Sequence, residues 1–315
     1  MDARCLAGHP MTKREKPALL VVLGPTGAGK SDVAHGIARE RGGEILSADA
    51  FAVYRGFDIG TAKPSAARRR EVPYHLIDVA DPSETFSAGR WALAARAIIE
   101  EVVSRGRLPI VCGGSGFYIR ALLEGLPPGD AVDPERRRAL ARWGDRDPGN
   151  AARMLALNDP EASARIAPGN RRYVLRALEI LLETGRPASS RLPIADAWAE
   201  GFRVVKVGVR PAAADLYARI ARRVREMLEA GWEEEVRGLL ARGVSRDANA
   251  FEAIGYRELA DAALPGGTDP GETERTIVTA TRQLAKRQAT WFRREPGVVW
   301  VEPAAALSRA LELLG

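Results

Sequence analysis

Cysteine and histidine are both scarce in this sequence of 315 residues. It has two cysteines and three histidines, which are Cys5, Cys112, His9, His35 and His75. Two cysteines cannot form a disulfide framework, and so few thiol and imidazole groups argue against a zinc site. We therefore expect a reduced protein of the cytoplasmic type.

Long hydrophobic runs and a secretory signal are missing as well. The longest purely aliphatic runs, such as Ala18–Leu23, are far shorter than the ~20 apolar residues of a membrane-spanning helix, so no membrane partner is expected. The N-terminal segment has neither an apolar stretch nor any periodicity. We expect a flexible tail over residues 1–17 without a secretory signal, and Met11 is a second candidate start.

The overall composition is that of an ordinary globular protein. Hydrophobic residues make up 46% of the chain and charged residues 28%, so a core can form and disorder is excluded as the main state. The length suggests about two domains. The 47 Lys and Arg residues exceed the 41 Asp and Glu residues, and the net charge of +6 permits a polyanionic partner without demanding one.

Short apolar runs alternate with helical patterns along much of the chain. Runs that predict buried parallel strands lie at Ala18–Leu23, 44–48, 75–79, 108–112 and 204–209. Helical patterns over 31–41 and 90–104 separate several of these runs. The alternation predicts an α/β fold in which helices flank a parallel sheet.

The segment that follows Pro127-Pro128-Gly129 has a different character, because it contains helical patterns and no convincing strand. Those patterns cover 133–143, 150–157 and 171–183. We therefore predict an inserted helical subdomain over residues 128–198. The core would consist of residues 18–127 and 199–315.

A phosphate-binding loop follows the first predicted strand. The residues Gly24-Pro25-Thr26-Gly27-Ala28-Gly29-Lys30-Ser31 match the pattern G-x-x-x-x-G-K-[ST], and a helical pattern begins near Ser31. In such a loop backbone N–H groups surround phosphate oxygens, the lysine supplies positive charge and the serine hydroxyl can bind Mg²⁺. We expect a di- or triphosphate here, and the motif alone leaves open which one binds and whether it is hydrolysed.

Asp49 and Asp78 follow the second and third predicted strands. Ligand-facing groups lie at the carboxyl ends of parallel strands, so either carboxylate could face the phosphate site. A hydrolysing ATPase would use one of them as a Mg²⁺ partner, and a transferase would use one as a general base. A carboxylate that only caps a turn or a helix is the third alternative.

A second glycine-rich turn, Gly113-Gly114-Ser115-Gly116, follows the strand predicted at 108–112. The Ser115 hydroxyl could bind a substrate, or it could cap the helix that starts near Phe117. The residues leave both roles open.

Two long helices with basic residues are predicted over 213–242 and 271–294. On the first, Arg219 and Arg223 lie one turn apart, where they could clamp a pyrophosphate or form a solvated charged face. The second helix places basic residues beside aromatic ones. It could bind nucleic acid, or its basic residues could form an edge that faces solvent. The basic and aromatic residues are Arg282, Lys286, Arg287, Arg293, Arg294, Trp291 and Phe292.

Several segments together resemble the tRNA dimethylallyltransferases (tRNA isopentenyltransferases, the IPP transferase family). They are Asp49–Pro64, Tyr74–Asp78, Gly113–Tyr118, Ala253–Arg257 and Thr281–Gln288, and the resemblance extends from Ala18 to Arg294. It implies a P-loop NTPase-like fold and a Mg²⁺-dependent prenyl transferase. Such an enzyme transfers the dimethylallyl group of dimethylallyl diphosphate to the exocyclic N6 amine of the adenosine 3′ of the anticodon in tRNA.

The resemblance also implies roles for individual residues. Lys30, Arg223 and Mg²⁺ at Ser31 would hold the leaving diphosphate, together with the rest of the phosphate loop. Asp49 would be the catalytic base, and Ser115, where the family usually has threonine, would orient the nucleotide. Contacts to the tRNA anticodon stem-loop are implied for Asp49, Ala50, Phe51, Ala52, Ser115, Arg137, Arg172, Tyr173, Val174, Leu175, Arg176, Arg282 and Lys286.

The sequence departs from the family pattern beside Asp49. The family usually has Asp-Ser-x-Gln where this chain has Asp49-Ala50-Phe51-Ala52, so a hydroxyl and an amide are lost next to the flipped base.

Two other functions are compatible with part of the same residues. An adenylate isopentenyltransferase of the cytokinin type would be expected to lack the full insertion and the basic helix, and a generic P-loop NTPase or kinase would share only the phosphate loop. We expect a cytoplasmic monomer.

Overall fold

The computed structural model describes residues 16–126, 134–190, 197–264 and 267–315. The chain divides into two compact units. The core unit comprises the residues up to Leu122 together with Ala197–Gly315, and the helical unit comprises Leu123–Asp196. Most of the predicted tail and the Pro127-Pro128-Gly129 boundary lie outside the described residues.

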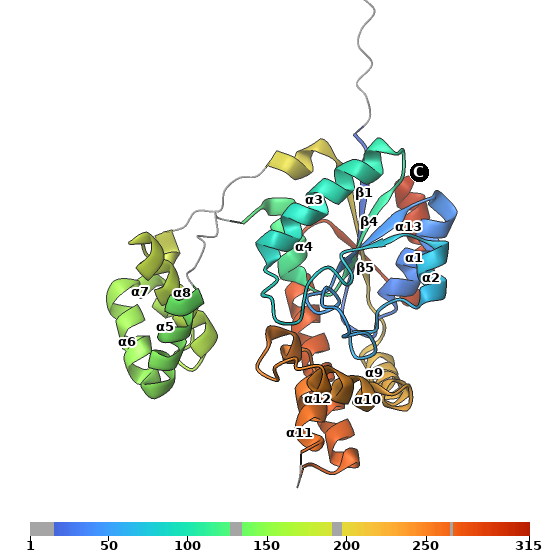
Figure 1. Cartoon of the computed structure of the whole chain (residues 1–315). Helices are drawn as coiled ribbons and strands as arrows, with labels where there is room; N and C mark the ends of the chain where they lie inside the picture. Colours follow the sequence, from blue (N-terminus) through green and yellow to red (C-terminus); the bar gives the residue numbers. More distant parts are fainter. Residues whose placement is uncertain (1–15, 127–133, 191–196, 265–266) are drawn as a thin grey trace, which may run out of the picture. The chain divides into compact units, whose positions relative to one another are not determined.

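The core unit is built on a sheet of six parallel strands in the order β3-β2-β4-β1-β5-β6 (Figure 1). The strands are β1 (Ala18–Leu23), β2 (Glu44–Ala48), β3 (Tyr74–His75), β4 (Pro109–Gly113), β5 (Arg203–Val209) and β6 (Val298–Val301). Gly113 pairs with Leu23 on one side and with Ala48 on the other, so β1, β2 and β4 end level with one another. The predicted parallel α/β fold is confirmed, and the loops after these three strands meet at one edge of the sheet.

Helices connect the strands and cover the sheet. Outside the helical unit they are α1 (Lys30–Arg41), α2 (Ala66–Glu71), α3 (Ala88–Ser104), α4 (Gly116–Glu124), α9 (Ala213–Glu229), α10 (Trp232–Ala241), α11 (Tyr256–Ala262), α12 (Pro270–Phe292) and α13 (Ala306–Leu314). No helix in the described part of the chain combines the length and the apolar character needed to span a membrane.

The core of this unit lies on both faces of the sheet. On one face α1 and α13 pack against the strands, with Ile37 and Ala306 fully buried beside Leu20. On the other face Trp91 of α3 is fully buried, and its Nε1–H donates to the carbonyl oxygen of Ser47 at 2.9 Å. Figure 1 shows these helices on opposite sides of the strands. Burial of a side chain such as Ile37 stabilises the fold by roughly 1.5–3 kcal/mol.

The helical unit consists of α5 (Pro134–Arg146), α6 (Pro148–Asn158), α7 (Pro160–Arg165) and α8 (Arg171–Thr184). Asp147 and Asp159 cap α6 and α7, because each carboxylate accepts a backbone N–H from the first turn of its helix. The helices pack around a small apolar core that includes Leu155, Val174 and Leu178. α7 was not among the predicted helices, since six residues are too few to show periodicity.

The unit ends before Trp198, where the predicted insertion had its boundary. The Trp198 indole N–H donates to Glu100 at 2.8 Å, and the Arg96 guanidinium lies 4.9 Å from the centre of its ring. Both partners belong to α3 of the core unit. Trp198 therefore packs as part of the core unit.

Two predicted elements are wrong in their extent. The strand predicted over 75–79 ends at His75, because Leu76 (φ 61°) and Asp78 (φ 60°) adopt left-handed backbone conformations that an extended strand cannot contain. The single helix predicted over 213–242 is interrupted at Gly231, whose φ of 93° starts a new helix. Glycine accepts this conformation without a side-chain clash. The apolar residues keep their helical spacing on both sides of the break, which is why the sequence predicted one helix.

Candidate active site

The phosphate loop connects β1 to α1. Gly24 (φ 141°), Gly27 (φ 79°) and Gly29 (φ 92°) take backbone conformations that other residues rarely adopt. A Cβ atom on Gly24 would also lie only 2.5 Å from the carbonyl oxygen of Val209 in the neighbouring strand. The glycines therefore let the chain turn tightly, and Lys30 and Ser31 begin α1 directly afterwards.

Lys30 is buried beneath this loop, and its Nζ donates to the carbonyl oxygen of Pro25 at 2.7 Å. Burial lowers the pKa of Lys30 from 10.5 to about 8, and the charge of Arg223 acts in the same direction while that of Asp49 acts against it. Ser31 is exposed at the start of the helix. At pH 7 the buried lysine is therefore still mostly protonated, but it loses its charge more readily than an exposed lysine.

Asp49 follows β2 and is half-buried. Its Oδ1 accepts the backbone N–H of Phe51 at 2.8 Å and that of Ala52 at 3.1 Å, which closes a tight turn. We call residues 49–52 the Asp49 turn. The second carboxylate oxygen makes no hydrogen bond to the described residues, so one oxygen holds the turn and the other is available to a ligand.

The second glycine-rich loop (residues 113–116) lies beside the Asp49 turn. A Cβ atom on Gly113 would be 2.0 Å from the carbonyl oxygen of Ala48, so the two loops leave the sheet in direct contact. The Ser115 hydroxyl accepts the N–H of Ala50 at 3.2 Å. The Ser115 hydroxyl therefore holds the Asp49 turn, a role that was not among the two left open for it from the sequence.

Helix α9 brings two arginines to the phosphate loop. Leu216 and Ile220 are buried under the loop, and a Cβ atom on Gly27 would lie 3.1 Å from Ile220. A Cβ atom on Gly29 would be 3.8 Å from an Nη atom of Arg219. Burial lowers the pKa of Arg223, against the attraction of Asp49.

Lys30, Arg219 and Arg223 form a cationic cluster at the phosphate loop. Neither arginine makes a hydrogen bond or an ion pair with the described residues, and Lys30 bonds only to a carbonyl oxygen. Such a cluster favours a multiply charged anion, because the anion would supply the missing counter-charge.

Asp78 does not face the phosphate site, contrary to one of the alternatives for its role. Its carboxylate accepts from Lys63 Nζ at 2.6 Å and from Arg69 at 2.8 Å. Burial alone would raise the pKa of Asp78, and the hydrogen bonds from Lys63 and Arg69 bring it below its ordinary value. Both carboxylate oxygens of Asp78 are therefore used by this ion network.

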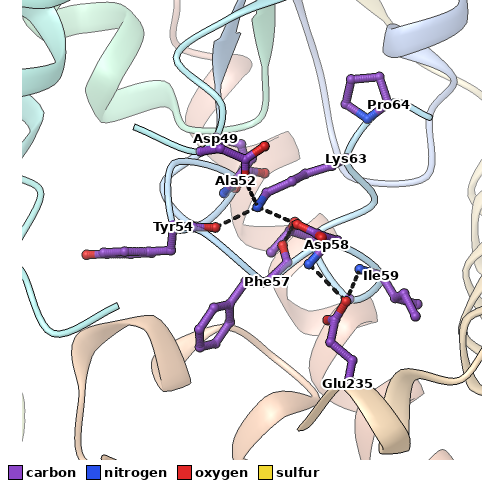
Figure 2. Close-up of polar contacts among 12 residues, drawn as sticks. Asp49, Ala52, Tyr54, Phe57, Asp58, Ile59, Lys63, Pro64 and Glu235 are labelled. Carbon is purple, nitrogen blue, oxygen red and sulfur yellow. Dashed lines mark hydrogen bonds and ion pairs between the residues drawn. The ribbon is translucent and has the colours of Figure 1, made fainter. Parts of the chain in front are cut away.

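Lys63 is the centre of the network, as Figure 2 shows. Only 2% of its side chain is exposed, and its ammonium also donates to Asp58 at 2.7 Å and to the carbonyl oxygen of Tyr54 at 2.5 Å. The N–H of Asp78 in turn donates to the carbonyl oxygen of Ala52 at 3.2 Å. The network therefore ties residues 54–64 and the end of β3 to the Asp49 turn.

Glu235 of α10 anchors the same loop from below (Figure 2). Its carboxylate accepts the backbone N–H groups of Asp58 at 3.1 Å and Ile59 at 2.9 Å, and the Tyr256 hydroxyl at 2.6 Å. Neither Lys63 nor Glu235 was singled out from the sequence. Lys63 lies within the segment Asp49–Pro64 that carries the resemblance, and that was its only signal.

The residues of the helical unit that were predicted to contact tRNA differ in their burial and in their partners. Val174 is buried in the core of the unit, so the predicted contact of its side chain with RNA is wrong, whereas Leu175 is partly buried against that core. Arg137 and Arg176 both form ion pairs with Glu179. Arg137, Arg172 and Tyr173 are exposed, and the tyrosine is 59% exposed.

The basic residues predicted on α12 also differ from one another. Lys286 is exposed, whereas the Arg282 guanidinium lies 5.4 Å from the centre of the Tyr217 ring. The buried Nε of Arg282 has no hydrogen-bond partner within the described residues. Lys286 is therefore open to solvent, and Arg282 is held against α9.

The comparison with known families decides among the candidate functions. A family model described as IPP transferase matches residues 52–295. The chain belongs to the IPP transferase family. The resemblance inferred from the sequence is thereby confirmed.

Individual IPP transferases are similar over nearly the whole chain. The tRNA dimethylallyltransferase 1 of Citrifermentans bemidjiense is 46% identical and covers 93% of this chain and 94% of its own length. The crystal structure of the full-length tRNA isopentenylpyrophosphate transferase from Bacillus halodurans has a TM-score of 0.66 at 35% identity, and covers 95% of this chain and 99% of its own.

A more distant structure, a eukaryotic dimethylallyltransferase acting on tRNA, shares the fold with this IPP transferase. Its TM-score is 0.77 at 23% identity, with 94% of this chain and 77% of that chain covered. Together these likenesses favour neither a generic P-loop kinase nor an adenylate isopentenyltransferase.

Proposed function

We propose that this IPP transferase moves the dimethylallyl group of dimethylallyl diphosphate to N6 of the adenosine 3′ of the anticodon in tRNA, and releases diphosphate. The observation that carries the proposal is the cationic cluster of Lys30, Arg219 and Arg223 beside the Asp49 turn, in a chain of this family. The cluster suits a leaving diphosphate, and the turn offers a carboxylate to the attacking amine.

The cationic side of the site would stabilise the leaving group. As the bond between C1 of the dimethylallyl group and its oxygen breaks, the electron pair stays with the diphosphate, whose negative charge grows. Lys30, Arg219 and Arg223 are already placed at the phosphate loop, so they need little reorganisation to meet that charge.

The carboxylate side would activate the nucleophile. The N6 lone pair forms the new bond to C1, and Asp49 takes the proton that N6 loses. An exocyclic amine on an aromatic ring is a weak nucleophile, so both a positioned base and good alignment matter. Asp49 can do this because only one of its two oxygens is used by the turn. The adenosine must be unstacked and flipped to reach it.

Mg²⁺ is the cofactor that we propose, with the Ser31 hydroxyl as its protein ligand. Within the described residues no group of three or more His, Cys, Asp and Glu side chains could hold a metal ion. An exposed hydroxyl at a phosphate loop nevertheless suits Mg²⁺, which usually keeps several waters and binds substrate phosphates. The ion would add positive charge to the leaving diphosphate.

We propose the tRNA anticodon stem-loop as the macromolecular substrate of a cytoplasmic, monomeric enzyme. Exposed cationic and aromatic side chains support this, among them Arg172 and Tyr173 of α8 and Lys286 of α12. Ala50 and Ala52 present no polar side chains to the flipped base, so its recognition would rest on Ser115, the backbone and shape.

One incubation tests the function. The protein is mixed with Mg²⁺, labelled dimethylallyl diphosphate, and either unmodified tRNA or AMP. We expect label on tRNA alone. Label on AMP alone would favour the cytokinin-type enzyme, and label on neither would refute prenyl transfer.

The affinity for the donor is expected to fall as the pH rises through about 8. Below that pH Lys30 is protonated in the free enzyme and attracts the diphosphate, and above it the lysine becomes neutral. Calorimetric titration with a non-reacting diphosphate analogue at about pH 7 and about pH 9 measures the change. The Lys30→Ala variant is the control and should lose most of the pH dependence. An equally steep dependence in that variant would assign it to another group.

Charge on α8 is expected to set part of the salt dependence of tRNA binding. Replacing Arg172 and Arg176 with glutamine should reduce the slope of log affinity against log salt by about 0.7–0.9 for each phosphate contact that is lost. The control is Arg153→Gln, which removes an exposed charge from α6 of the same unit. Binding is measured by fluorescence anisotropy at several salt concentrations. An unchanged slope in the double variant would show that this part of α8 does not touch RNA.

A further inference from the structure

A single amide bridges the two loops that hold the two halves of the reaction. Gln288 lies on α12, and its Oε1 accepts the backbone N–H of Thr26 in the phosphate loop at 2.7 Å. Its Nε2 donates to the carbonyl oxygen of Gly114 in the second glycine-rich loop at 3.0 Å. The two loops follow β1 and β4, which are adjacent in the sheet, and the amide lies between them.

Close packing fixes the position of this amide. A Cβ atom on Gly114 would lie 2.4 Å from Gln288 Nε2, and one on Gly116 would lie 2.2 Å from Trp291 Nε1. One turn earlier on α12, Ala285 is fully buried against Leu216 and Ile220 of α9. The helix therefore presses on the second loop from one side and is held by α9 from the other.

The two loops carry different reacting groups. Thr26 belongs to the loop that contains Lys30, at which the diphosphate would leave. Gly114 precedes Ser115, whose hydroxyl holds the N–H of Ala50 next to the base Asp49. The Gln288 side chain therefore joins the loop at which the diphosphate would leave to the loop that holds the turn of the base.

The chemistry of the side chain matters as much as its reach. An amide offers an acceptor and a donor on one rigid plane, so it satisfies an N–H on one loop and a carbonyl on the other. Methionine has a similar length and makes neither bond. In a displacement reaction a misplacement of about 1 Å can cost about 10²-fold in rate, because the reacting atoms must approach to roughly 3–3.5 Å in line.

We propose that Gln288 is a positioning residue that sets the alignment of the donor with the acceptor amine by joining the phosphate loop to the second glycine-rich loop. The inference rests on the proposed prenyl transfer. It assigns to Gln288 no contact with tRNA and none with the diphosphate.

The test compares Gln288→Met with Gln283→Met, a control on the same helix whose side chain is exposed and makes no hydrogen bond to the described residues. Three quantities are measured in each: the affinity for a non-reacting diphosphate analogue, the affinity for tRNA, and the single-turnover rate with both substrates saturating. For Gln288→Met we expect both affinities within about 3-fold of wild type and the rate about 30–100-fold lower. The control should match wild type in all three.

Other outcomes would overturn the proposal. A loss of tRNA affinity that accounts for the whole effect would make Gln288 an RNA contact. A loss of donor affinity as large as the loss of rate would show that Gln288 only supports the phosphate loop. An unchanged rate would show that it has no role in transfer. If Gln288→Met unfolds, as judged by its thermal midpoint, Gly114→Ala decides instead, since its methyl group displaces the amide and should give the same pattern. A wild-type protein that transfers no label refutes the proposed function itself and is thus a distinct result.

Discussion

Lys30→Ala is expected to lower dimethylallyl transfer by about 10³-fold, the upper part of the range seen when a preorganised charge-stabilising group is removed. Lys30 is the buried cation under the phosphate loop, held by the carbonyl oxygen of Pro25. Without it, the growing charge on the diphosphate would meet only the two arginines and Mg²⁺. The loss should appear in the single-turnover rate as well as in donor affinity, because the charge on the leaving group is greatest in the transition state.

The fold should survive this substitution. Burial of the ammonium costs free energy, which is why its pKa is lowered, so its removal does not take away a net stabilising interaction. Circular dichroism and a thermal midpoint check this directly. Lys16→Ala, which removes an exposed charge before β1, serves as the control and should leave transfer unchanged. Near-normal turnover in Lys30→Ala would contradict the role of the loop in transfer.

Asp49→Asn is expected to lower turnover by about 10²-fold or more, the usual effect of losing a general base. The amide oxygen of asparagine can still accept the N–H groups of Phe51 and Ala52, so the turn should keep its shape. The amide cannot accept the proton from N6. Affinities for tRNA and for the diphosphate analogue should therefore stay close to wild type, while the single-turnover rate falls.

Asp32→Asn is the matched control, because Asp32 is an exposed carboxylate on α1 that pairs with Arg68. It should retain nearly full activity. A second measurement separates two of the three roles that the sequence left open for Asp49, those of general base and of metal partner. If excess Mg²⁺ restores the rate of Asp49→Asn, the carboxylate is a metal partner, and the base must be sought elsewhere.

The parts of the fold that could be predicted are those that local sequence determines. Ala18–Leu23 and 44–48 are continuous apolar runs next to turn residues, and both are strands with those bounds. β6 was not predicted, because Val298–Val301 is four residues long and becomes a strand only by pairing with β5. The break at Gly231 was missed because the apolar spacing of α9 continues in α10, so the local pattern predicts one continuous helix.

The site divides in the same way. The phosphate loop is one contiguous segment, and its glycines, lysine and serine match a known pattern, so it was found from the sequence. Lys63 and Gln288 were not, because their importance lies in partners that folding brings together. Gln288 bonds to residues 262 and 174 positions away along the chain. A lysine or a glutamine in a helical or loop segment carries no local sign of such a bond.

The packing of α13 against α1 has a consequence for the order in which the molecule is made. A Cβ atom on Gly36 of α1 would lie 3.2 Å from Leu307, and Arg41 at the end of α1 donates to the carbonyl oxygen of Leu311. The helix α1, which follows the phosphate loop, leaves the ribosome long before α13, the helix that packs on it. Until β6 and α13 have been made, β5 has an open edge and the apolar face of α1 lacks the cover of α13, and such exposed surfaces promote aggregation. The nascent chain can therefore bury this face of α1 fully only after α13 has been made.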